Sequence, residues 1–215
     1  METVFDTENN CYNTLVVEEP RFMARLLNDI VSQIQGLEGE AVLSVADRPA
    51  PFSKRAALLD RFVPFELNQK PLLNQMTGAL VKAASAPEHF ERTASALSAV
   101  ELWLDALAFD FPCDIAFPNI AVAALVKASA PEIRCETASI AEKVADYMEL
   151  VETFDQSRLF FTLNMRSFVC DEEMERFTAT VLSHGYHVIG IENMARPLLT
   201  AEKRVIVDAN LCEIC

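Results

Sequence analysis

The side chains best placed to do chemistry are three aspartates around the end of a long central helix. Asp105 lies near the last turn of that helix, and Asp110 and Asp114 stand on either side of Pro112 in the turn that follows. Calcium takes several oxygen ligands, and loops often supply them. The spacing makes these aspartates candidate calcium ligands, and a solvated acidic turn is the alternative.

Cysteine and histidine give weaker signals. Cys212 and Cys215 form a C-x-x-C, but no second pair of zinc ligands accompanies it. We expect reduced thiols and small apolar side chains on a last strand. Cys170 and His187 could act as a nucleophile and its base only if the fold brings them together. The alternative for His187 is a histidine at the edge of a strand.

A phosphate-binding loop is absent from the sequence. Such a loop needs closely spaced glycines, whose backbone amides hold the phosphate, in the frame G-x-x-x-x-G-K-[ST]. None of the five glycines stands in that frame. The first predicted strand instead leads into Glu18, Glu19 and Pro20, which offer carboxylates and a missing amide. The sequence therefore argues against an ATPase that uses this standard loop, and no nucleotide cofactor is expected.

Net charge argues against a protein that coats nucleic acid over its whole surface. The 215 residues carry 18 basic and 32 acidic side chains, a formal charge of −14. The basic residues are dispersed, although an arginine fork suits phosphate contact. On charge alone, Lys54, Arg55 and Arg166 are candidates for binding DNA.

These residues need an α/β framework to position them. Strand-like runs at 14–17, 41–45 and 159–163 alternate with apolar stripes at helical spacing, such as 22–34, which predicts a largely parallel sheet. The stretch 68–130 reads instead as helices, with Asn68 as an N-cap. We therefore predict an α/β head formed by 1–67 and 131–215, and an inserted helical leg formed by 68–130.

The location follows from what the sequence lacks. There is no apolar run of the roughly 20 residues that a membrane helix needs. The first residues also lack the basic end and apolar stretch of a signal peptide. We expect a cytoplasmic protein with no membrane partner.

The order of short segments resembles a known family. A first strand and helix at 14–27, the segment Phe65-Glu66-Leu67-Asn68, the run 159–164 and the strand 187–192 follow one another as in that family. The closing Val205-Ile206-Val207-Asp208 is similar to the element before its terminal strand. The chain thus resembles the small CRISPR-associated protein specific to type II-A systems, the Csn-two family, over nearly its whole length.

The resemblance implies a non-enzymatic role in spacer acquisition. Family members have a head similar to P-loop ATPase heads, without a working phosphate loop, and a helical leg inserted in it. They form a homotetrameric ring that calcium supports. Basic residues line its central hole, which holds linear double-stranded DNA without sequence specificity. The CRISPR integrase pair and the RNA-guided effector nuclease are the implied protein partners.

The resemblance also assigns individual residues. Arg25 stands where a relative has a basic residue on the first helix, and Lys127 matches a basic position before Pro131. The acidic leg junction of the family is only partly kept, because Asp114 retains one carboxylate while Ala116 and Pro118 replace others. Two other readings stay open, a degenerate nucleotide-binding α/β enzyme and a protein-only adaptor in the acquisition complex.

Overall fold

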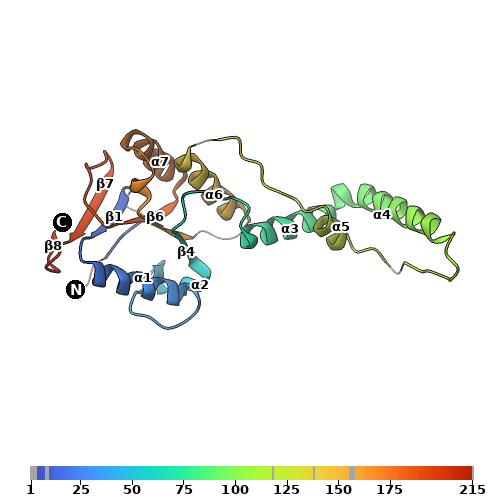
Figure 1. Cartoon of the computed structure of the whole chain (residues 1–215), viewed down its shortest axis with the longest axis horizontal. Helices are drawn as coiled ribbons and strands as arrows, with labels where there is room; N and C mark the ends of the chain where they lie inside the picture. The colour runs from blue at the N-terminus through green and yellow to red at the C-terminus, as the bar shows by residue number, and fades with distance from the viewer. Residues whose placement is uncertain (1–3, 8–9, 118, 138, 155–157, 215) are drawn as a thin grey trace. The chain divides into compact units, whose positions relative to one another are not determined.

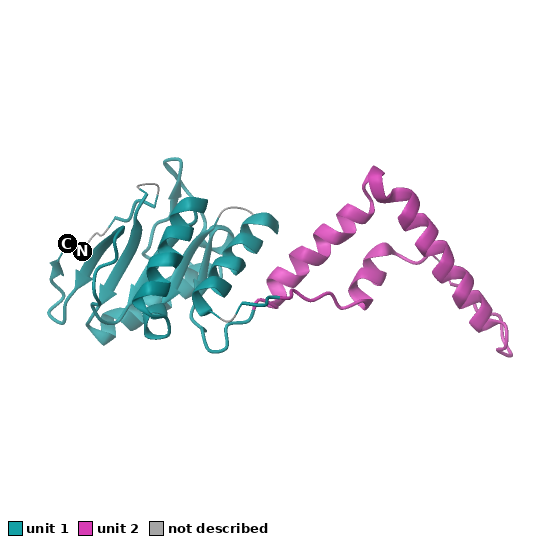
Figure 2. Cartoon of the chain, turned by 90° about the horizontal axis from the view of Figure 1, so that it is seen from above, with its two compact units in different colours: residues 1–66, 135–215 teal, residues 67–134 magenta. Residues whose placement is uncertain are grey.

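The chain folds into two compact units, the second inserted in the first. A computed structural model describes residues 4–7, 10–117, 119–137, 139–154 and 158–214. The first unit comprises residues 1–66 and 135–215, and the second comprises 67–134 (Figure 2). The sequence-based leg at 68–130 falls within the bounds of the second unit.

A six-stranded sheet forms the centre of the first unit, in the order β4-β5-β6-β1-β7-β8 (Figure 1). All neighbouring strands are parallel except β7 and β8. The predicted α/β class with a largely parallel sheet is therefore confirmed. The strands are β1 (Tyr12–Val17), β4 (Ala56–Leu59), β5 (Leu159–Leu163), β6 (His187–Glu192), β7 (Glu202–Val207) and β8 (Glu213–Ile214).

Helices cover both faces of this sheet (Figure 1). On one face, α1 (Pro20–Ile34) and the short α2 (Phe52–Arg55) pack on alternate strand residues such as Leu15 and Ile191. On the other face, α7 (Asp171–His184) packs edge-on against Tyr12 through Phe177, with α6 (Ile140–Phe154) beside α7. Alternation along β1 explains both cores, because successive strand side chains point to opposite faces.

The predicted strand at 41–45 is wrong. Only Ser44–Val45 (β2) is extended, and it pairs with Arg48–Pro49 (β3) in a separate hairpin. The reason lies in α1, where the Asp29 carboxylate accepts hydrogen bonds from the backbone N–H groups of Glu40 and Ala41 at 2.9 and 3.1 Å. These bonds attach the start of the 41–45 segment to α1 and not to the sheet. The edge strand that pairs with β5 is β4.

The described residues of the second unit form three helices, α3 (Lys70–Ala84), α4 (Pro87–Ala108) and α5 (Val122–Ala128). The predicted N-cap at Asn68 is wrong, because α3 begins after Gln69. Asn68 instead bonds the backbone of Ile133 twice, through its Nδ2 at 3.1 Å and its Oδ1 at 2.8 Å. The side chain thus joins the two ends of the inserted unit. Among the described residues, no helix is both long and apolar enough to cross a membrane.

Candidate nucleic-acid interface

Basic side chains gather on the α1 and α2 side of the sheet. Arg25 is exposed on α1, with its guanidinium 5.3 Å from the centre of the Phe22 ring. Lys54 and Arg55 end α2, where Lys54 is exposed and Arg55 is half-buried. The structure therefore brings Arg25, Lys54 and Arg55 to the same face of the first unit. We call these residues the α1–α2 surface.

The only carboxylate of α1, Asp29, does not compete with a phosphate for these cations. Asp29 accepts the two backbone N–H bonds described above and a third from Gln33 Nε2 at 2.9 Å. Burial alone would raise the pKa of Asp29, but these three hydrogen bonds lower it below its usual value. The charge of Asp29 is therefore held within the protein's own backbone.

A second basic surface lies in the inserted unit. α3 and α5 pack against each other, and together they contain three lysines and no carboxylate. Lys70, Lys82 and Lys127 are all exposed. Sequence reasoning found Lys127 and missed the other two, although the absence of acidic residues over 70–84 was a visible signal. These three residues are the α3–α5 surface.

The helices on the other face of the sheet have the opposite charge. α6 contains Lys143 against four carboxylates, and α7 contains Arg176 against another four. α1, in contrast, holds two arginines and one aspartate. The helices on the two faces of the sheet thus differ in charge: α6 and α7 are acidic, whereas α1 is weakly basic.

Arg166 does not belong to either surface. It lies in the short helix η1 (Met165–Ser167), and its side chain is only 2% exposed. Its Nη2 donates to Asp171 Oδ1 at 2.8 Å and to the Pro197 carbonyl oxygen at 2.9 Å. A buried guanidinium with these partners is not available to a phosphate. The expectation that Arg166 binds DNA is therefore corrected, and the residue is structural.

The three candidate calcium ligands lie around the C-terminus of α4: Asp105 is in its last turn, and Asp110 and Asp114 follow the helix. Asp105, Asp110 and Asp114 are all exposed. In the part of the chain that the structure describes, no three His, Cys, Asp or Glu side chains come close enough together to hold a metal ion. The described residues of a single chain therefore do not form a calcium site by themselves.

The position that binds phosphate in nucleotide-binding α/β proteins is filled by the chain itself. That position is the N-terminus of the helix after the first strand. Here the Glu19 carboxylate caps α1, accepting from Arg21 N at 3.1 Å and Phe22 N at 2.6 Å. A carboxylate thus occupies the place of the phosphate, which disfavours the reading of the chain as a nucleotide-binding enzyme.

This cap gives a direct stability prediction. Replacing Glu19 by alanine removes both acceptors and leaves two N–H groups of α1 without them. We expect a loss of about 1 kcal/mol of unfolding free energy, as for other N-cap truncations. Urea unfolding followed by far-UV circular dichroism measures this loss. An unchanged midpoint would show that the cap contributes nothing.

The cysteine and histidine candidates are not brought together. His187 Nδ1 lies 2.9 Å from Thr7 Oγ1, whereas Cys170 caps α7 next to Glu173. Cys212 is exposed with a free thiol, and Cys215 lies outside the described residues. The described structure gives no support to a thiol nucleophile.

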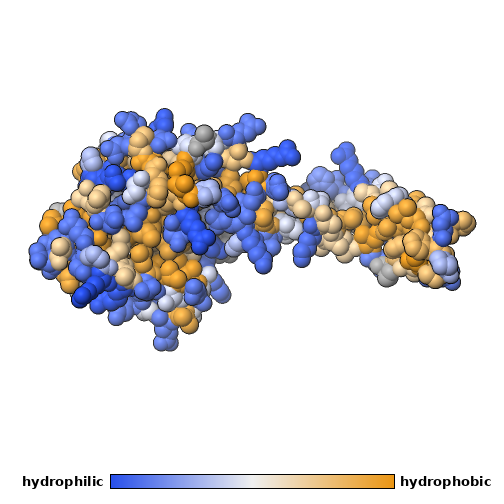
Figure 3. Space-filling view, in the orientation of Figure 1, coloured by the Kyte–Doolittle hydropathy of each residue, from blue (hydrophilic) through white to orange (hydrophobic). Residues whose placement is uncertain are grey.

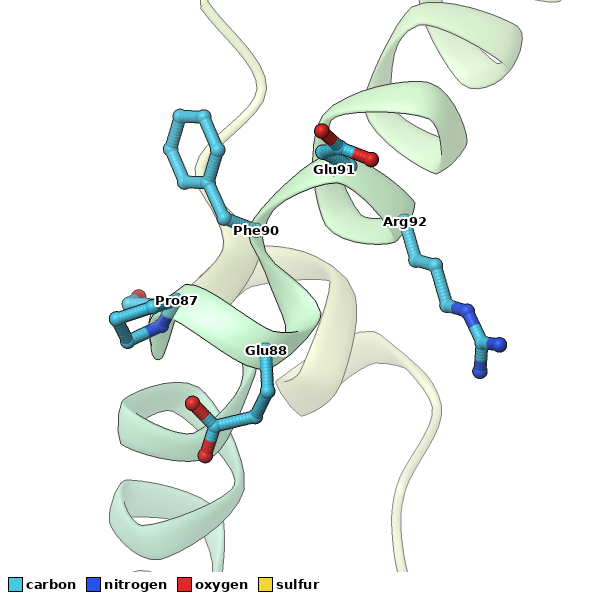
Figure 4. Close-up of a pocket in the computed structure, with 6 residues that line it drawn as sticks. Pro87, Glu88, Phe90, Glu91 and Arg92 are labelled. Atoms are coloured by element: carbon cyan, nitrogen blue, oxygen red, sulfur yellow. The ribbon is translucent and has the colours of Figure 1, made fainter.

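A concave region of about 520 Å³ lies at the elbow between α3 and α4. Its lining includes Glu88, Phe90, Glu91 and Arg92, which Figure 4 shows pointing away from one another. Small-molecule sites need polar groups that converge on one point. The elbow therefore lacks the arrangement of a substrate site.

Fold and surface together define a class of protein: an α/β sheet without a phosphate loop, interrupted by a helical unit, with its cations on particular helices. The family model of a CRISPR-associated protein (Cas_Csn2) matches residues 33–211. That match covers most of the chain, so the chain belongs to this family and has a CRISPR-associated role.

A solved structure supports the fold. The crystal structure of Stu0660 of Streptococcus thermophilus superposes with a TM-score of 0.55 at 14% sequence identity. The alignment covers 86% of this chain and 64% of the Streptococcus chain, so our chain spans less than two thirds of that protein's length. A comparison with curated proteins gives no significant match.

Proposed function

We propose that this protein binds linear double-stranded DNA during spacer acquisition and performs no chemistry on it. The observation that carries the proposal is the charge of particular helices, because α3 and α5 of this acidic chain hold three exposed lysines and no carboxylate. Backbone phosphates are the polyanion that such dispersed cations fit, and they carry no sequence information. Arg25, Lys54, Arg55 and Lys127 are the proposed contacts, joined by Lys70 and Lys82.

Self-association is the second part of the proposal. None of the 22 residues of α4 is buried, although the helix carries Leu102 and Trp103 at 70% and 60% exposure. Figure 3 shows apolar side chains on the surface of this unit. Exposed apolar surface of this kind is typical of protein interfaces. A homotetrameric ring that places basic surfaces around a shared duplex is consistent with it.

The mode of DNA binding has a simple test. A ring that loads from an end will bind a linear duplex and not the same sequence as a closed circle. Affinity for the linear form will fall steeply with salt, because each phosphate contact releases counterions. Fluorescence anisotropy of linear and circular duplexes of equal length measures both. Equal binding of the two forms would contradict end loading.

Trp103 provides a probe of self-association, since it is the only tryptophan of the chain. We expect the tryptophan emission to shift to shorter wavelength as protein concentration rises, because association removes the indole side chain from water. Leu102→Glu places a charge beside it and will abolish the shift. Ala179→Glu, which adds the same charge on the exposed side of α7, is the matched control. A shift that persists in Leu102→Glu would exclude α4 as the interface.

The proposed protein partners are the integrase pair and the RNA-guided effector nuclease. The carboxylates of α6 and α7 support a contact with basic proteins. A protein-only adaptor is the second candidate function, and the same acidic helices favour it. The adaptor function would be preferred if loss of the lysines of the α3–α5 surface left spacer acquisition intact.

A further inference from the structure

The connection between β6 and β7 runs across the sheet without a helix. β6 and β7 lie on either side of β1 and are both parallel to it. Residues 193–201, here called the return segment, must therefore pass from the carboxyl end of β6 over β1 to the amino end of β7. A parallel crossover usually contains a helix that satisfies its own backbone groups, and this one does not.

Arg166, which is buried, and Arg204, which is largely buried, take over that role. Arg204 Nη1 donates to the Arg196 carbonyl oxygen at 2.6 Å, and Arg166 Nη2 donates to that of Pro197 at 2.9 Å. Glu202, whose side chain is fully buried, accepts two bonds from Arg204 at 2.7 and 2.8 Å. The return segment is thus attached through charged side chains.

Two further bonds attach the end of the segment. The Leu199 N–H donates to Glu202 Oε2 at 2.9 Å, and the Thr200 N–H donates to Glu175 Oε1 of α7 at 2.9 Å. These two amides report directly on whether the segment is attached, because each would exchange with solvent once its carboxylate partner leaves.

Glu192, the last residue of β6, immediately precedes the return segment and is the weak point of this arrangement. Its side chain is buried, and its Oε1 accepts only the backbone N–H of Arg166 at 3.2 Å. Its Oε2 is buried with no hydrogen-bond partner among the described residues. A buried carboxylate with an unpaired oxygen is costly when ionised and much less so when protonated.

We propose that Glu192 makes the return segment a pH-dependent latch, which is held tightly when this side chain is protonated and loosely when it is ionised. The titratable and charged groups that interact with Glu192 lie on four elements. They are the neutral Tyr12 on β1, Arg166 on η1, Arg196 on the return segment and Glu202 on β7. Asp171 of α7 acts on the group through its ion pair with Arg166.

The direction of the effect follows from linkage. Burial raises the pKa of Glu192 from 4.5 to about 6, and the Arg166 hydrogen bond and the charges of Arg166 and Arg196 only partly offset this. Release of the return segment would open the end of β6 to water, and the Glu192 carboxyl would regain its ordinary pKa. The extra stability of the attached state is therefore fully present below about pH 4.5 and is lost as pH rises through about 6. Release would also alter an exposed surface that includes Met194 and Leu198.

Hydrogen exchange of the Leu199 and Thr200 amides tests the latch. After correction for intrinsic exchange, opening should become on the order of tenfold more frequent between pH 5 and 7.5. Glu192→Gln should keep both amides protected and remove the pH dependence. Glu149→Gln, on the exposed side of α6, should behave as the wild type. The same pH dependence in Glu192→Gln, or none in the wild type, would overturn the proposal.

A second measurement protects the test against a variant that does not fold. The carboxyl carbon of Glu192 can be titrated in the wild type by nuclear magnetic resonance. The proposal predicts a midpoint near 6 that coincides with the chemical-shift change of the Thr200 amide. An ordinary glutamate midpoint, or a Thr200 change at a different pH, would contradict it. Both measurements use free protein, so their outcome is independent of DNA binding.

Discussion

Replacing Lys70, Lys82 and Lys127 together by glutamine will weaken the binding of linear duplex at least about tenfold at moderate salt. Glutamine keeps most of the side-chain length, so the change removes charge with little change of shape. The three lysines face solvent on helices that hold no carboxylate. Their removal leaves the inserted unit with no cation on its two packed helices.

Salt dependence separates this effect from a loss of structure. Each lost phosphate contact lowers the slope of log affinity against log salt by about 0.9. Arg92→Gln is the matched control, because Arg92 is exposed on α4 among acidic residues. It should leave both affinity and slope nearly unchanged. If the triple variant binds with the wild-type slope, the α3–α5 surface does not contact DNA.

Replacing Arg166 by alanine will cost about 3–5 kcal/mol of unfolding free energy, the largest stability effect that we expect. Arg166 lies between the carboxylates of Asp171 and Glu202 and also holds the Pro197 carbonyl oxygen. Its removal leaves Glu202, which is fully buried, with Arg204 as its remaining ionic partner. The return segment loses one of its attachments at the same time.

Two comparisons isolate the buried charge. Arg176→Ala on the exposed side of α7 should change stability by no more than about 0.5 kcal/mol. Arg166→Met restores the volume without the charge, and it should lose less than Arg166→Ala. Urea unfolding followed by far-UV circular dichroism measures all three variants. A wild-type midpoint in Arg166→Ala would mean that the buried cluster contributes no stability.

Strong periodicity was enough to predict much of the fold. The runs at 159–163 and 187–191 have the composition of buried strands, and the stripe over 22–34 has helical spacing, so each was recognised from local residues alone. β4 was missed because Ala56-Ala57-Leu58-Leu59 has no strand preference of its own. It becomes a strand by pairing with β5, which lies about a hundred residues further along the chain.

The candidate site shows the same division between local and distant information. Charge alone could nominate Arg166 and Lys54 equally, but only the fold shows that one is buried and the other exposed. The lack of acidic residues around Lys70 and Lys82 is visible in the sequence, but the packing of α3 against α5, which brings Lys127 to the same pair of helices, is not. Ala41 was predicted in a strand, but its N–H group bonds the Asp29 carboxylate instead. That contact joins residues twelve positions apart and is not visible in the local sequence.

Sedimentation equilibrium of the protein with a short linear duplex tests the central claim most directly. The account predicts one species whose mass equals four chains of 23.9 kDa and one duplex, and which dissociates from DNA as salt is raised. A single chain that sediments alone, with the duplex free at low salt, would contradict it.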